Sequence, residues 1–171
     1  MKVFIICSKK FYSKIEEIKN ILESRNIEVF LPNCYDNPNK ELEMWKLGKK
    51  EHQKFKALMY KQSEEVISNM DAVLVLNLDK EKDGKIYKNY IGGATFLEMY
   101  DAFRLGKQIY LYNDIPNGLL YDEIEGFNPI IINGNLDLIN NKVKKYVWFF
   151  WNKYYNSDLL GRTIWLIMKK I

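Results

Sequence analysis

The stretch AVLVLNL, residues 72–78, is apolar but for one asparagine and has the length of a β-strand. Runs of this kind are typical of a strand buried on both faces in the middle of a parallel sheet. Comparable short apolar runs occupy Val3–Cys7, Ile27–Leu31, Ile109–Tyr112 and Ile130–Ile132. We therefore expect a parallel sheet of about five strands.

Helical patterns separate these runs. Ser13 and Glu16 form an S-x-x-E capping box ahead of a one-sided apolar stripe. Residues 39–69 have a helical pattern in one or two pieces, with Gly48 as the candidate break, and a further helix runs from about Gly93 to a C′ glycine at Gly106. This alternation predicts an α/β fold, a Rossmann-like or flavodoxin-like doubly wound parallel sheet with helices on both faces. We expect the polar segments DKEKDGKIYK and DEIEG to be loops.

The length of 171 residues suits one domain with a real core. We assign residues 1–138 to that domain and residues 139–171 to a C-terminal amphipathic helical extension, packed on the domain or on a partner subunit. The helical spacing of this extension is carried by Val143, Val147, Phe150, Trp151 and Tyr154. Polar residues interrupt it, so no run approaches the ~20 apolar residues of a membrane span. Contact with a membrane surface stays open as an alternative.

The composition limits the possible chemistry. A net charge of +4 suits an anionic small molecule and falls short of a nucleic-acid polymer. Cys7 and Cys34 are too few for a disulfide framework or a four-ligand zinc site, and His52, the single histidine, argues against a histidine triad or metal cluster. Neither a G-x-G-x-x-G segment nor a P-loop is present. We expect a cytoplasmic protein without metal or cofactor, with Cys7 buried and His52 on the surface.

Polar residues stand where the predicted strands end. They are Ser8, Asn33, Asn77 with Asp79, Asn113 with Asp114, and Asn133. The carboxyl ends of parallel strands meet at one edge of the sheet, and ligands bind beyond that edge near the switch in strand order. The sequence therefore predicts a small-molecule site at this edge.

The segment NYIGGATFLEMYDAF, residues 89–103, places two glycines and a glutamate at the start of a helix. Gly92 and Gly93 allow a ligand to approach the backbone closely, and the free N–H groups of a helix start favour anions. Small residues at 94, 95 and 102 leave space around Glu98. From the spacing alone, Glu98 is either an exposed helix charge or a catalytic carboxylate.

Three segments together resemble the nucleoside 2-deoxyribosyltransferase-like superfamily. They are MDAVLVLNLD (70–79), NYIGGATFLEMYDAFRLGKQIYLYN (89–113) and YDEIEGFNPIIINGNLD (121–137). The signature of that family is an Asp-x-Gly-Thr-x-x-Glu segment that opens a helix, with the glutamate as nucleophile. Its threonine and glutamate fall on Thr95 and Glu98, whereas its aspartate falls on Gly92 and its glycine on Ala94.

The resemblance implies a deoxyribosyltransferase or a hydrolase that acts on the N-glycosidic bond of a nucleoside or nucleotide. Glu98 would attack the anomeric carbon as the base leaves, through an oxocarbenium-like transition state. Asp79 and Asn89 would supply the sugar contact missing at Gly92. Ser8, Lys9 and Lys10 would hold a 5′-phosphate, or they form a solvated loop. The expected substrate-binding residues are Ser8, Asn77, Asp79, Asn89, Tyr90, Gly92, Gly93 and Thr95.

Two other functions stay open. One is a non-catalytic nucleotide-binding module of the same fold, which Gly92 in place of the acid favours. The other is an interaction protein built around the aromatic C-terminus. The resemblance also implies a homodimer or a higher homo-oligomer, because sites in this family commonly borrow from a neighbour and the C-terminal aromatics exceed the needs of one small core.

Overall fold

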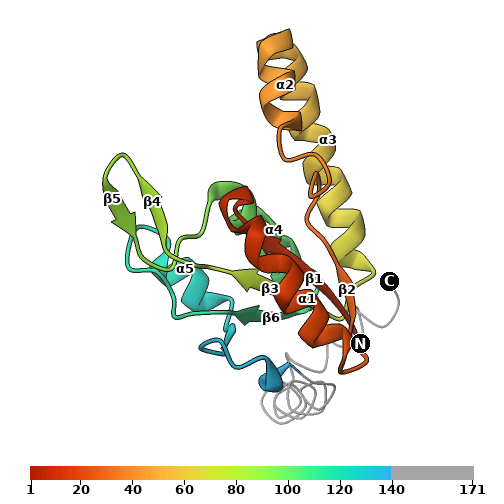
Figure 1. Ribbon diagram of the computed structural model, residues 1–171, viewed down its shortest axis with the longest axis vertical. Helices are drawn as coiled ribbons and strands as arrows, with labels where there is room; N and C mark the ends of the chain where they lie inside the picture. The colour runs from red at the N-terminus through yellow and green to blue at the C-terminus, as the bar shows by residue number, and fades with distance from the viewer. Residues whose placement is uncertain (140–171) are drawn as a thin grey trace, which may run out of the picture. The chain divides into compact units, whose positions relative to one another are not determined.

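Five parallel strands form the central sheet of the computed structural model, which describes residues 1–139 (Figure 1). Nearly all of these residues belong to one compact unit, Met1–Leu138. The strands are β1 (Lys2–Cys7), β2 (Glu28–Phe30), β3 (Ala72–Leu76), β6 (Gln108–Leu111) and β7 (Ile130–Ile131). Their order is β2-β1-β3-β6-β7, and every neighbouring pair is parallel. The predicted flavodoxin-like α/β fold is confirmed, and the switch point lies between β1 and β3.

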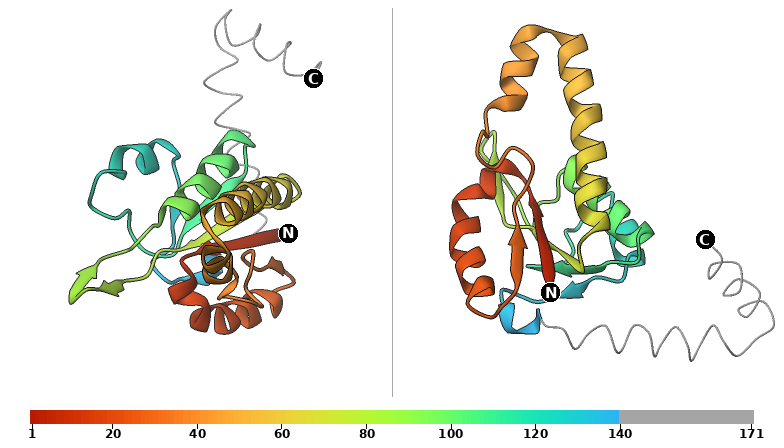
Figure 2. Two further views of the ribbon diagram at one scale, coloured as in Figure 1. Left: turned by 90° about the horizontal axis from the view of Figure 1, so that it is seen from above. Right: turned by 90° about the vertical axis from the view of Figure 1, so that its right-hand side faces the viewer.

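Helices cover both faces of this sheet, because successive side chains of a strand point to opposite sides. On one face lies α1 (Ile15–Glu23), and on the other lie α3 (Lys49–Ser68), α4 (Gly93–Arg104) and α5 (Tyr121–Gly126) (Figure 2). Alternate residues of β1 and β3 form a core with the second group of helices. They are Phe4, Ile6, Val73 and Val75, packed with Ile67, Met99 and Ile124.

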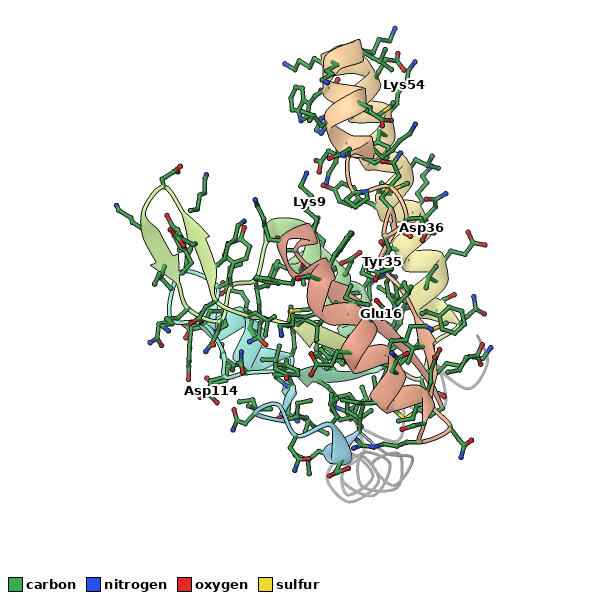
Figure 3. The ribbon with its side chains drawn as sticks, in the orientation of Figure 1. Lys9, Glu16, Tyr35, Asp36, Lys54 and Asp114 are labelled. Atoms are coloured by element: carbon green, nitrogen blue, oxygen red, sulfur yellow. The ribbon has the colours of Figure 1, made fainter. Side chains whose placement is uncertain are left out.

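A helical hairpin rises from the carboxyl edge of the sheet. It consists of α2 (Lys40–Leu47) and α3, joined at Gly48, whose φ of 127° confirms the predicted break. No residue of α2 is buried, and in α3 only Ser63 and Ile67 are. Figure 3 places Lys54 on the part of the hairpin that stands clear of the sheet. Within residues 1–139, no helix is long and apolar enough to cross a membrane.

The chain turns helical after β1 earlier than the capping box predicts. A 3-10 helix, η1 (Lys9–Lys14), follows the strand directly, and the hydroxyl of Ser8 accepts a hydrogen bond from the Lys10 amide at 3.5 Å. Ser13 lies inside η1, so it does not cap α1. The cap is set by the first polar residue after the strand.

Two segments predicted as loops are ordered elements. The polar stretch after β3 forms a hairpin of β4 (Lys80–Lys82) and β5 (Lys85–Tyr87), turning at Asp83 and Gly84, both with positive φ. An Asp-Gly pair is a strong turn signal that the polar composition concealed. The acidic segment forms α5, because Ile124 packs into the core. The C-terminal helix predicted after residue 139 lies outside the described residues and stays a prediction.

Candidate functional site

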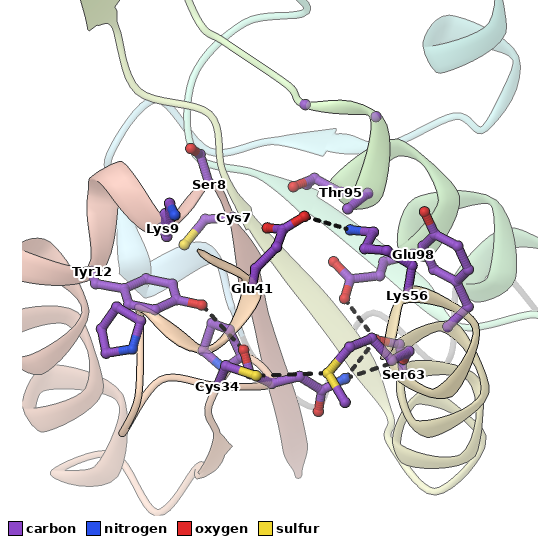
Figure 4. Close-up of a pocket in the computed structure, with 18 of the residues that line it drawn as sticks. Cys7, Ser8, Lys9, Tyr12, Cys34, Glu41, Lys56, Ser63, Thr95 and Glu98 are labelled. Atoms are coloured by element: carbon purple, nitrogen blue, oxygen red, sulfur yellow. Dashed lines mark hydrogen bonds and ion pairs between the residues drawn. The ribbon is translucent and has the colours of Figure 1, made fainter. Parts of the chain in front are cut away.

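A cavity of about 430 Å³ opens at the carboxyl ends of β1 and β2, beside the N-terminus of α4 (Figure 4). The strands and η1 supply Cys7, Ser8, Lys9, Tyr12, Pro32, Asn33 and Cys34. The helical hairpin and the segment before it supply Pro38, Glu41, Phe55, Lys56, Met59, Tyr60 and Ser63. The connection after β3 and the start of α4 supply Tyr90, Gly92, Gly93, Ala94, Thr95 and Glu98. We refer to this cavity as the Glu98 pocket.

The carboxylate of Glu98 is fixed by a hydrogen-bonded chain. Its Oε1 accepts a hydrogen bond from the hydroxyl of Ser63 at 2.8 Å, and that hydroxyl accepts one from the Asn33 amide at 2.9 Å. Ser63 is buried, with 4% of its surface exposed. These two hydrogen bonds link α4 to α3 and to the segment that follows β2. Glu98 therefore lies half-buried in the pocket rather than on an exposed helix face.

Burial raises the pKa of Glu98 from its ordinary value of 4.5 to about 7, because the charged form loses its hydration. The hydrogen bond from Ser63 and the positive charge of Lys56 oppose this rise, and the negative charge of Asp101 adds to it. At neutral pH the carboxyl group is thus divided between its charged and neutral forms. Such a group can take or give a proton or act as a nucleophile.

The start of α4 faces the pocket without a side-chain cap. Gly92 is the N-cap, and its side-chain position is closed by Tyr90: a Cβ there would lie 3.3 Å from the Tyr90 hydroxyl. The Tyr90 ring is held in turn by the Lys80 ammonium, 3.9 Å from the ring centroid. Thr95 is buried, and no described residue forms a hydrogen bond with its hydroxyl. The backbone N–H groups and this hydroxyl are therefore available to a ligand.

The helical hairpin brings a second charged group into the pocket that the sequence did not indicate. One carboxylate oxygen of Glu41 lies 3.6 Å from the Lys56 ammonium and 3.2 Å from His52 Nε2. Although burial opposes it, the contacts with His52 and Lys56 lower the pKa of Glu41. The His52 ring stacks on Trp45, with centroids 3.9 Å apart, and only 13% of its side chain is exposed. The expectation that His52 is a surface residue is therefore wrong.

The pocket also contains groups held in their neutral forms. Burial, with a smaller contribution from Glu98, raises the pKa of the Cys7 thiol to about 12. Burial also raises the pKa of Tyr12, whose hydroxyl donates a hydrogen bond to the Asn33 carbonyl at 3.2 Å. Both groups stay protonated at neutral pH, so Glu98 and Glu41 are the groups that can carry negative charge in the pocket.

Three predicted binding residues lie outside the Glu98 pocket. Asn77 is fully buried, and its side-chain amide joins β3 to the segment after β6. The Nδ2 group donates hydrogen bonds to the backbone carbonyls of Asn113 and Asp114 at 3.1 and 2.8 Å, and Oδ1 accepts one from the backbone N–H of Asn113 at 2.8 Å. Asp79 accepts hydrogen bonds from the Asn89 amide, at 3.0 Å, and from Lys88. These side chains brace strand ends and the β4–β5 hairpin. The residues that the structure does bring together are Ser8, Tyr90, Gly92, Gly93, Thr95 and Glu98.

The donor groups of the pocket suit an organic ligand. Tyrosine and phenylalanine rings stand beside lysines and amide N–H groups. Among residues 1–139, no cluster of three or more histidine, cysteine, aspartate or glutamate side chains could hold a metal ion.

No protein-family model and no curated protein matches the sequence. Several solved structures are similar to it, and two of them follow. The CMP N-glycosidase BcmB of Clostridium botulinum has a TM-score of 0.43 and 19% identity, covering 88% of this chain and 97% of that one. The flavoenzyme NAD(P)H:(acceptor) oxidoreductase FerB of Paracoccus denitrificans has a TM-score of 0.40 and 14% identity, covering 76% and 74%. A glycosidase and an oxidoreductase are alike at this level, so the similarity says nothing of this chain's chemistry.

Proposed function

We propose that the protein cleaves the N-glycosidic bond of a nucleoside or nucleotide, with Glu98 as the nucleophile. The observation that carries this proposal is the position of the Glu98 carboxylate, fixed on one oxygen by Ser63 inside a pocket at the switch point of the sheet. No described residue donates a hydrogen bond to the second oxygen, Oε2. That oxygen is free to approach a carbon atom.

The rest of the pocket suits a nucleoside. Its volume of about 430 Å³ falls in the ordinary range for ligand sites. The rings of Tyr12, Phe55 and Tyr90 offer faces for a base, and the start of α4 offers N–H groups for sugar or phosphate oxygens. The resemblance in the Thr95–Glu98 segment points to the same substrate class.

In the proposed reaction, ionised Glu98 attacks the anomeric carbon as the bond from that carbon to the base nitrogen breaks. The bonding electrons leave with the base, which takes up a proton, and a glycosyl ester forms on Glu98. Water then attacks the same carbon and releases the sugar, or a second base does so and completes a transfer. The hydrogen bond from Ser63 stabilises the carboxylate before the attack and again when it is released.

A non-catalytic nucleotide-binding module is the second candidate. The observation in its favour is that the first turn of α4 carries no acid: Gly92 has no side chain, and Tyr90 occupies the space next to it. In this case the same pocket would bind the ligand and leave it intact.

The test is release of free base from a panel of nucleosides and their 5′-monophosphates, followed by chromatography. We expect release by the unaltered protein, and a loss of orders of magnitude in Glu98→Gln with ligand affinity retained, because only a transition-state interaction is removed. Glu65→Gln, an exposed carboxylate of α3, is the matched control. Equal binding without release by either protein would favour the binding module, and binding of no member of the panel would exclude both.

A further inference from the structure

Lys56 lies in the Glu98 pocket but is only loosely held. Its ammonium is 3.6 Å from Glu41 Oε1, longer than an ordinary hydrogen bond, and 26% of the lysine and 41% of the glutamate side chain are exposed. Figure 4 shows the two side chains meeting in the pocket close to Glu98. Exposed pairs of this kind are weak, so a stronger anion can displace Glu41 from the lysine.

Glu41 has a second partner besides Lys56. The Nε2 of His52 lies 3.2 Å from the same oxygen, and stacking on Trp45 fixes the imidazole in place. The charged groups that face His52 are Glu41 of α2 and, across that carboxylate, Lys56 of its own helix. Glu41 therefore keeps a polar contact when Lys56 turns to another anion.

We propose that Lys56 selects a phosphate-bearing ligand for the Glu98 pocket by leaving Glu41 for the phosphate oxygens. In the free protein the Glu41 carboxylate contacts both His52 and Lys56. In the complex the ammonium pairs with phosphate oxygens, and Glu41 keeps its contact with His52. This inference rests on the proposed function for its substrate, a nucleotide in preference to a nucleoside. The binding step itself requires no bond cleavage.

The first experiment is isothermal titration calorimetry of the full chain with inorganic phosphate and with ribose 5-phosphate, at pH 7.5. We expect phosphate to bind in both cases. Lys56→Met should weaken binding roughly tenfold or more, as for loss of a hydrogen bond to a charged group. Lys50→Met, an exposed lysine of α3, is the control and should bind as the unaltered protein does.

Two further variants separate the roles of the partners. Glu41→Gln removes the competing anion, so phosphate should bind several-fold more tightly. His52→Gln keeps a hydrogen-bond donor near Glu41, so phosphate should still bind. A role for Glu41 in structure alone would weaken binding in Glu41→Gln rather than strengthen it. Thermal melts of each variant report whether the hairpin remains folded.

Failure of this inference is distinguishable from failure of the proposed function. The inference is overturned if phosphate does not bind, if Lys56→Met binds it unchanged, or if Glu41→Gln binds it more weakly. If phosphate binds through Lys56 and no base is released from any nucleotide, the proposed function fails alone. If base is released equally well from nucleosides and nucleotides, and Lys56→Met releases it at the same rate, the inference fails alone.

Discussion

The buried carboxylate of Glu98 should make the protein less stable at high pH, and replacing it with glutamine should remove that loss. Its pKa of about 7 in the folded protein lies above the ordinary value of 4.5, which the unfolded chain adopts. Between these values the folded state holds more protons than the unfolded state, so the free energy of unfolding falls as the pH rises. The stabilisation that the folded state gains by holding this proton is therefore intact below pH 4.5 and fully lost above pH 7.

The size of the effect follows from the two pKa values. Their separation corresponds to about 3 kcal/mol, of which about 2–3 kcal/mol develops between pH 5 and pH 8. Glu98→Gln keeps the acceptor for the Ser63 hydroxyl and introduces no charge. We expect its stability relative to the unaltered protein to rise by that amount from pH 5 to pH 8, or about 5–10 °C in melting temperature for a chain of this length.

Urea unfolding at a series of pH values measures this difference, with Glu65→Gln as the control for a change at an exposed carboxylate. The control should change little relative to the unaltered protein over the same range. If Glu98→Gln also shows no pH-dependent gain, Glu98 is not desolvated, and its pKa does not lie near 7. Such a result would remove the electrostatic basis for its role in the pocket.

Three further outcomes are expected. The rate of base release should rise with pH through about 7 as Glu98 ionises, and Ser63→Ala should move this rise upward by about one pH unit, because the hydrogen bond from Ser63 lowers the pKa. A rate that falls with pH would instead make Glu98 a general acid. Asn77→Ala should cost about 2–4 kcal/mol in unfolding free energy by leaving buried backbone groups unpaired, and an unchanged urea midpoint would contradict this. Light scattering of the full chain at micromolar concentration should show a homodimer or a larger assembly. The reason is that the α4 residues Leu97, Tyr100 and Phe103 are all more than 40% exposed. A monomer would refute the predicted assembly.

The fold could be predicted from the sequence because strands, helix starts and helix ends are each marked by a few neighbouring residues. The apolar run at Ala72–Leu76 is short and rich in β-branched residues, which favours a buried strand, and Gly48 ends a helix because few other residues adopt its backbone conformation. The glycine pair before Glu98 likewise marked the helix start at which the pocket lies.

The partners of Glu98 could not be predicted in the same way. Ser63 and Glu98 are 35 positions apart, and their contact depends on how α3 packs on α4. Asn77 illustrates the opposite error: a polar residue at a strand end has the same sequence pattern whether it faces a ligand or joins the next strand. Its role was decided by the chain after β6, which supplies the Asn113 and Asp114 carbonyls.

The sparse packing of the helical hairpin sets how long the pocket stays closed. An isolated helix as short as α2 is marginal in water, and α2 buries no residue, so its opening requires far less free energy than unfolding of the sheet. Amide protons of α2 should therefore exchange with solvent much sooner than those of β3, which is buried throughout. Glu41 leaves the pocket with each such opening, and a ligand held between Lys56 and Glu98 would slow the exchange. The affinity of the pocket is then reduced by the fraction of time that the hairpin is open.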